Sequence, residues 1–296
     1  GREGEEGREE VGSHPHMDLS LPLLEQYSRP FLLTQRGDEG KGAVAQLKSL
    51  QAAAFRDKGA EAPPEEVAAL DQLAAYLAQD PANPKEPLPK ACYRFMARVL
   101  AEWPLKSWGP ALDIFRLLLL YQPVSRHYAN SAGNPVPIIV KRCLSRSDAV
   151  PRGVKLRALF AVTNAFAHAE GTRAVTRGGA LGELIEAALE MLSAQDAAVR
   201  MSAAAVLYNV ALQLPKHASI EVVQIASGLG HMLSEEKDKD TAFRMLLGLG
   251  KLAYCNTEAV QLLQTLALQI NTEEWGGAED GRVKAAHELK MLLGEA

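Results

Sequence analysis

The sequence predicts an all-α protein built as a stack of helices, and three observations lead to that prediction. Alanine and leucine dominate the 296-residue chain, aromatic residues make up only 6%, and runs of β-branched residues are few. This balance favours helices. No segment alternates apolar and polar residues with the period of two that a half-buried strand requires. Finally, three apolar segments follow one plan at a nearly constant spacing, which is typical of a helical repeat.

The elements are expected in the following order. Residues 1–17 join a Gly/Glu/Arg run to GSHPHM, so we predict a disordered or expression-derived leader, followed by one domain over residues 18–296. Residues 19–33 are cut by prolines and predict a short helix or an irregular arm. Pro64 and the two glutamates after it are typical of a helix start. Helices are expected at residues 43–56, 64–79, 89–102, 109–121, 123–130, 136–146, 151–168, 179–193, 196–213, 219–234, 239–254, 256–268 and 278–293.

The three similar segments are LRALFAVTNAFAHAEGTRAV, MSAAAVLYNVALQLPKHAS and FRMLLGLGKLAYCNTEAV. Each is a nearly all-apolar helix, a short turn and a partner helix. Alignment on Asn164, Asn209 and Lys251 gives steps of 45 and 42 residues, a period typical of armadillo and HEAT solenoids. A helix that packs against neighbours on both sides is apolar nearly all round. We therefore predict a right-handed helical solenoid whose few polar inner positions line its concave surface.

Two arginines interrupt apolar helices: Arg116 in PALDIFRLLLLY and Arg244 in TAFRMLLGLGKL. A permanent cation in such a place must be paired, reach solvent, or point into a groove that receives a negative group. Asn164 and Asn209 are the polar positions of other inner helices. They resemble the armadillo pattern, in which side-chain amides hydrogen-bond an extended peptide backbone. In the alternative interpretation, Asp113 pairs with Arg116 and the asparagines only cap neighbouring turns.

Charge is unevenly distributed along the chain, whose net charge is -4. Residues 85–157 hold thirteen Lys/Arg against four Asp/Glu, whereas the first 84 residues hold eight basic and fifteen acidic residues. A basic middle in an acidic protein predicts a localised anionic partner and a positive wall on the concave surface. The alternative is a set of solvated helix faces.

The sequence offers no signature of catalysis. GDEGKGA at residues 37–43 lacks the spacing of a phosphate-binding loop, and neither G-x-S-x-G nor H-E-x-x-H occurs. Cys92, Cys143 and Cys255 lie far apart and form no C-x-x-C pair, which fits a reducing compartment and no zinc site. No apolar stretch is long enough to span a membrane. We predict a monomer in the cytoplasm or nucleus, with no catalytic residue, metal site, cofactor or nucleic-acid partner.

Three segments carry a family resemblance: PALDIFRLLLLYQPVSRHY, LRALFAVTNAFAHAEG and DKDTAFRMLLGLGKLAYCNTEAVQLLQTL. They are similar to the PUL domain, the C-terminal module of the phospholipase-activating-protein family, which also occurs beside thioredoxin and isopeptidase domains. The resemblance runs from about residue 19 to the end of the chain. It implies an armadillo-like stack that binds the acidic C-terminal tail of valosin-containing protein, an AAA ATPase that extracts ubiquitinated substrates. The family's two tail-binding arginines match Arg116 and Arg244.

The leading hypothesis is therefore a non-enzymatic adaptor that holds the ATPase tail in a basic concave groove. Arg116 and Arg244 would bind carboxylates, while Asn164 and Asn209 would bind the tail backbone. Two alternatives remain open. One is a helical-repeat scaffold or RNA-binding module that uses the same basic region. The other is an accessory domain of a thioredoxin or isopeptidase fusion.

Overall fold

The computed structural model describes residues 19–34, 39–130, 134–144, 149–177, 179–214, 219–268, 270, 272 and 275–295. Within these ranges the secondary structure is helical throughout and contains no strand, which confirms the all-α prediction. The leader at residues 1–17 lies outside the described residues. The helices are α1 (Pro22–Gln26), α2 (Glu39–Arg56), α3 (Pro64–Leu77), α4 (Lys90–Glu102), η1 (Leu105–Ser107), α5 (Trp108–Leu118), α6 (Gln122–Asn130), α7 (Pro135–Cys143), α8 (Arg152–Asn164), η2 (Ala165–Ala167), α9 (Ala169–Thr176), α10 (Gly179–Met191), α11 (Ala197–Ala211), α12 (Ile220–Leu233), α13 (Lys239–Cys255), α14 (Thr257–Thr265) and α15 (Gly281–Leu293).

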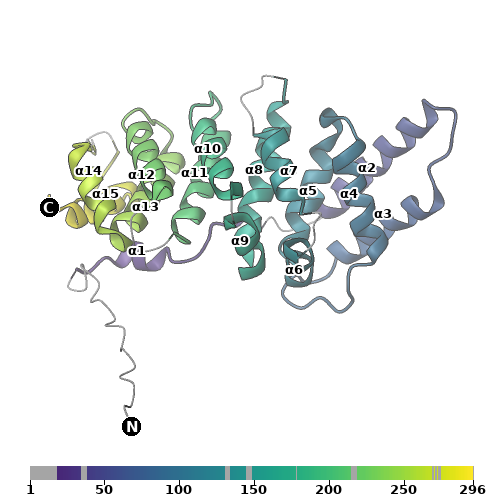
Figure 1. The fold of residues 1–296 in the computed structure, drawn as a ribbon, viewed down its shortest axis with the longest axis horizontal. Helices are drawn as coiled ribbons and strands as arrows, with labels where there is room; N and C mark the ends of the chain where they lie inside the picture. Colours follow the sequence, from purple (N-terminus) through teal and green to yellow (C-terminus); the bar gives the residue numbers. More distant parts are fainter. Residues whose placement is uncertain are drawn as a thin grey trace, which may run out of the picture.

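Most of the helices form two long layers. The inner layer is α2, α5, α8, α11, α13 and α15, each packed against the next, and the outer layer is α4, α7, α10, α12 and α14. Figure 1 shows one elongated stack that runs from α2 and α3 at one end to α14 and α15 at the other. Asn164, Asn209 and Lys251 lie on the successive inner helices α8, α11 and α13. The solenoid and the register of its repeats are therefore confirmed.

Inner helices are apolar all round because neighbours cover both of their sides. Eleven of the fifteen residues of α11 are buried, including the run from Ser202 to Ala211. Glycine allows the closest approaches in α13: a Cβ at Gly248 would lie 3.0 Å from the Leu229 side chain, and one at Gly250 would lie 2.6 Å from Leu24. Larger residues at these positions would push the packed elements apart.

Several helix boundaries differ by up to four residues from the predicted ranges, and two of the differences involve close glycine contacts. α2 begins at Glu39 rather than at residue 43, and Gly40 in its first turn lies close to α3, where a Cβ would lie 3.2 Å from the Leu77 Cβ. The predicted ranges contain no helix that matches α9, although the repeat plan of residues 156–175 includes a partner helix after a short turn. α9 follows a break at His168, whose backbone is extended, and Gly171 allows the tight return, since a Cβ there would lie 2.3 Å from the Ala165 carbonyl oxygen.

The predicted proline-cut arm is present and lies along the inner layer. It consists of α1 followed by the irregular residues 27–34, and we call residues 21–34 the arm. α1 packs against α15 and α13 at the C-terminal end of the stack. The chain then passes α11 and α8 to reach α5, so the arm runs opposite to the order of the helices.

The three cysteines should react unequally in the folded protein. Burial raises the pKa of Cys92 to about 11 and that of Cys143 to about 12, so both remain thiols at neutral pH and are shielded from reagents. Cys255 is only partly buried. We expect iodoacetamide to alkylate Cys255 first in native protein and all three cysteines in guanidinium, as counted by mass spectrometry. Rapid labelling of Cys92 without denaturant would contradict the packing described above.

Candidate peptide-binding site

Five side chains, one from each of five successive inner helices, bind the backbone of the arm. We call them the concave row: Arg116 on α5, Asn164 on α8, Asn209 on α11, Lys251 on α13 and Glu288 on α15. All five are buried. Their regular spacing follows from the repeat, which places one polar residue on the concave side of each inner helix.

The two asparagines bind alternate residues of the arm through both backbone groups. Asn209 Oδ1 accepts from the Phe31 N–H at 2.8 Å, and its Nδ2 donates to the Phe31 carbonyl at 2.9 Å. Asn164 does the same for Leu33, at 2.8 and 3.3 Å. These contacts have the amide-to-backbone geometry expected from the sequence, but the bound segment belongs to the same chain.

The alternative role of the asparagines, capping neighbouring turns, also occurs. Asn164 Nδ2 donates to the Arg116 carbonyl at 2.9 Å, and Asn209 Nδ2 donates to the Thr163 carbonyl at 3.4 Å. Each amide therefore joins the end of the preceding inner helix to the arm. Neither side chain has any exposed surface, so both amides must satisfy their hydrogen bonds within the protein.

The C-terminal half of the concave row holds the start of the arm. Glu288 accepts from the backbone N–H groups of Leu23 and Leu24 at 2.7 and 2.8 Å, which places a carboxylate at the N-terminus of α1, where it is favourable. Lys251 donates to the Leu24 carbonyl. Burial lowers the pKa of Lys251, while Cys255 and nearby glutamates partly oppose that effect.

Arg116 lies at the centre of an ion-pair network rather than in an open groove. It is 3% exposed; its Nη2 donates to Glu39 at 2.8 Å, its Nε to Asp113 at 3.1 Å, and its Nη1 to the Leu33 carbonyl at 3.3 Å. The second oxygen of Asp113 accepts from Arg157 Nε at 2.6 Å. The local pairing considered as an alternative from the sequence is thus present, together with a partner on α2 that the sequence did not indicate.

Arg244 differs from Arg116 in position and in partners. It lies two turns before Lys251 on α13, is partly exposed, and donates from Nη1 to the Asp240 carbonyl at 2.8 Å. Its guanidinium carbon lies 5.0 Å from the centre of the Phe31 ring, a cation–π contact. Burial lowers the pKa of Arg244, whereas the charges of Asp240 and Asp238 raise it. Within the described part of the chain, no carboxylate lies in salt-bridge distance of its guanidinium.

The prediction that the basic residues of segment 85–157 form a positive wall on the concave surface is wrong for many of them. Five basic residues of the segment belong to the outer helices α4 and α7: Lys90, Arg94, Arg98, Lys141 and Arg142. Arg142, for example, stacks on Trp108 at 4.5 Å and donates to the Leu100 carbonyl. Arg116 and Arg157 lie on inner helices, but both bind Asp113. Charge counted along the chain did not reveal how the side chains divide between the two layers.

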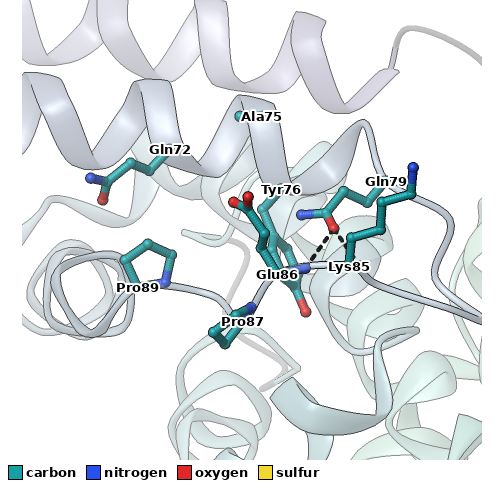
Figure 2. A pocket seen from close by; sticks show the side chains of 8 residues that line it. All are labelled: Gln72, Ala75, Tyr76, Gln79, Lys85, Glu86, Pro87 and Pro89. Carbon is teal, nitrogen blue, oxygen red and sulfur yellow. Dashed lines mark hydrogen bonds between the residues drawn. The ribbon is translucent and has the colours of Figure 1, made fainter.

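Two hollows flank the N-terminal half of the stack. One, of about 620 Å³, lies where the arm meets α2 and α5 and is lined by residues including Leu32, Glu39, Leu117 and His168. The other, of about 320 Å³, lies between α3 and the 85–89 loop, where Gln79 Oε1 accepts hydrogen bonds from the backbone N–H groups of Lys85 and Glu86 (Figure 2).

The described residues hold no cluster suited to a metal ion. None of their helices combines the length and apolar composition needed to cross a bilayer.

Sequence reasoning missed three residues of the site as binding groups. Lys251 served only to align the repeats, and neither Glu288 nor Tyr208 was singled out, although the Tyr208 hydroxyl donates to the Tyr27 carbonyl. The available signal was the one that identified the arginines, namely a charged residue among apolar neighbours. Applied to GKLAYC, it indicates Lys251, but in AAHELKMLL it marks Glu288 together with His287 and Lys290.

Two comparisons with known proteins bear on this architecture. A family model, the PUL domain, matches residues 39–287. The crystal structure of an engineered protein from the Northeast Structural Genomics Consortium superposes with a TM-score of 0.56 at 17% sequence identity, covering 88% of this chain and 100% of that one. At that identity the likeness shows a shared fold alone.

Proposed function

This chain belongs to the PUL domain family, a family of helical protein-interaction modules, and from that premise we propose that it is a non-enzymatic adaptor for an acidic protein tail. The proposed ligand is the C-terminal tail of the AAA ATPase valosin-containing protein, bound along the concave surface. The observation that carries the proposal is the concave row, because Asn164 and Asn209 already bind an extended backbone there.

Arg244 is the residue best suited to a ligand carboxylate. Its guanidinium is partly desolvated beside Phe31 and lies beyond salt-bridge distance of every described carboxylate. An arginine can bind a carboxylate through two parallel N–H groups, and partial burial strengthens such a contact.

The role that we propose for Arg116 is different, because it already has carboxylate partners. Its partner Glu39 has a side chain that is 39% exposed, so a tail carboxylate can replace that of Glu39 without leaving the arginine unpaired.

The proposed partner also sets the proposed place of action, the cytoplasm or nucleus, and the adaptor would act there as a monomer. RNA binding and accessory service to a thioredoxin or isopeptidase domain are the competing functions. The outer positions of Arg94, Arg98, Lys141 and Arg142 argue against a concave RNA groove, since they lie on α4 and α7.

Titration calorimetry with a synthetic peptide of the ATPase tail tests the proposal. We expect one peptide to bind per chain, and we expect binding to weaken when the acidic residues of the peptide are replaced by amides, because the Arg244 contact requires a carboxylate. A single-stranded RNA oligonucleotide serves as the competing ligand. Equal affinity for the acidic and amidated peptides, or tighter RNA binding with a steep dependence on salt, would reject the tail-binding proposal.

A further inference from the structure

We propose that the concave surface holds a site selective for an extended segment with an aromatic residue at the position bound by Asn209, and that the arm is its internal competitor. The proposal rests on the proposed function to the extent that the external ligand is taken to be an acidic tail. Nothing outside the chain is needed to define the site, because residues 27–34 of the arm occupy it.

The side chains that bind the ligand backbone contact two alternate residues of the arm. Asn209 binds both backbone groups of Phe31, and Asn164 binds both backbone groups of Leu33. Only an extended segment presents residues i and i+2 in this way. The intervening Leu32 lines the 620 Å³ hollow instead. These contacts would hold any extended chain, so selectivity must come from the side chains.

Side chains around Phe31 supply that selectivity. The centre of the Phe31 ring lies 4.8 Å from that of Tyr208, which belongs to the inner helix α11. Arg244 lies against the same ring, at 5.0 Å. A tilted aromatic pair with a guanidinium nearby favours an aromatic residue over an aliphatic one of similar size. A ligand that supplies an aromatic residue and a carboxylate would satisfy both Tyr208 and Arg244.

The start of the arm is fixed by buried side chains, whereas the part in the groove is held by hydrogen bonds to its backbone and buries little side-chain surface. Leu21 is 0% exposed and Leu24 is 2% exposed, the latter packed against Gly250, and Glu288 binds two N–H groups of α1. Residues 27–34, in contrast, are half-buried or exposed and have no regular structure. Segments with little buried surface open at low cost. Residues 27–34 can therefore leave the site as a loop while α1 and α2 keep their places.

Occupation by a tethered segment reduces the apparent affinity for any other ligand. The apparent dissociation constant equals the intrinsic one divided by the fraction of molecules whose site is open. A site closed nine times in ten therefore loses about tenfold in affinity. The arm thus sets the threshold at which an external tail binds, and loosening it should reveal the intrinsic affinity.

The test uses the full chain carrying Phe31→Ala and Leu33→Ala, which weaken the arm but leave Asn164, Asn209 and Arg244 unchanged. Two probes are titrated by calorimetry: a synthetic peptide with the sequence of residues 19–34, and the acidic tail peptide. We expect the arm peptide to bind the double variant but barely the parent chain, and the tail peptide to bind the double variant about tenfold more tightly. Ser28→Ala, at an exposed position of the arm, is the control and should behave like the parent. Circular dichroism confirms that each variant is folded.

The outcomes separate the two proposals. If the arm peptide binds only the double variant and the tail peptide binds neither protein, the site is real and the tail-binding function is wrong. If the tail peptide binds both proteins equally and the arm peptide binds neither, the tail lies elsewhere and the internal-competitor proposal is overturned. An arm peptide with alanine at the positions of Phe31 and Leu33 must bind more weakly, or the proposed sequence selectivity is overturned.

Discussion

Arg116→Ala should lower the free energy of unfolding by about 3 kcal/mol, the scale for breaking a buried ion pair by removing one partner. The side chain is 3% exposed and donates to Glu39, Asp113 and the Leu33 carbonyl. Its loss leaves a cavity between α5, α2 and the arm, and it leaves two carboxylates with one fewer cation. Asp113 keeps Arg157 and Glu39 is partly exposed, so the effect should lie at the lower end of the range for such pairs.

Urea denaturation followed by circular dichroism measures this effect. Arg94→Ala is the matched control, because Arg94 is exposed on the outer helix α4, and its removal should change the free energy of unfolding by less than about 0.5 kcal/mol. Arg116→Lys should lie between the two, since lysine keeps the charge but lacks the planar fork. If Arg116→Ala is as stable as Arg94→Ala, Arg116 is no brace and its contacts in the stack carry little energy.

The inner helices could be predicted because the residues that define them lie within each helix's own stretch of sequence. A helix covered on both sides has to be apolar in its own sequence, and α8, α11 and α13 therefore carry their environment in their residues. The start of the helix α9 could not be predicted in the same way. The helix is short, follows an extended His168, and depends on Gly171 lying against the Ala165 carbonyl, a contact that hydrophobic spacing does not encode.

The candidate site could be predicted only in part, because its occupant lies far away in the sequence. Polar positions on the inner helices indicated Asn164 and Asn209, and the expectation of an extended backbone beside them came from the armadillo resemblance. That this backbone is Phe31 and Leu33, separated from the asparagines by 178 and 131 residues, has no local signal. The same limit hid the pairing of Arg116 with Glu39 across 77 residues. From the sequence the two arginines looked equivalent, but in the structure Arg116 is buried among three partners, whereas Arg244 is partly exposed and lies against Phe31.

Arg244→Ala should weaken binding of the acidic tail peptide by tens-fold or more, the scale of about 2–5 kcal/mol for a desolvated arginine–carboxylate contact. The melting temperature should change little. Arg244 is partly exposed, and its described hydrogen bond is to Asp240 in its own helix. Its contact with Phe31 is worth about 0.5–1 kcal/mol at such a site. Calorimetry and thermal unfolding of the same samples measure both effects, with Arg94→Ala as the control.

Arg244→Ala has two opposing effects on tail affinity, and they can be separated by repeating the substitution in the chain that carries Phe31→Ala and Leu33→Ala. Loss of the guanidinium removes the ligand's partner, but it also removes a contact that holds Phe31, which loosens the arm and favours the tail. Because a ring contact is weaker than a carboxylate contact, the net result should still be a loss of affinity. In a chain that already carries Phe31→Ala and Leu33→Ala, the arm no longer contributes, so the loss caused by Arg244→Ala should be larger than in the parent. No loss in that background, together with a gain of affinity in the parent chain, would mean that Arg244 acts only by holding the arm and does not bind the tail.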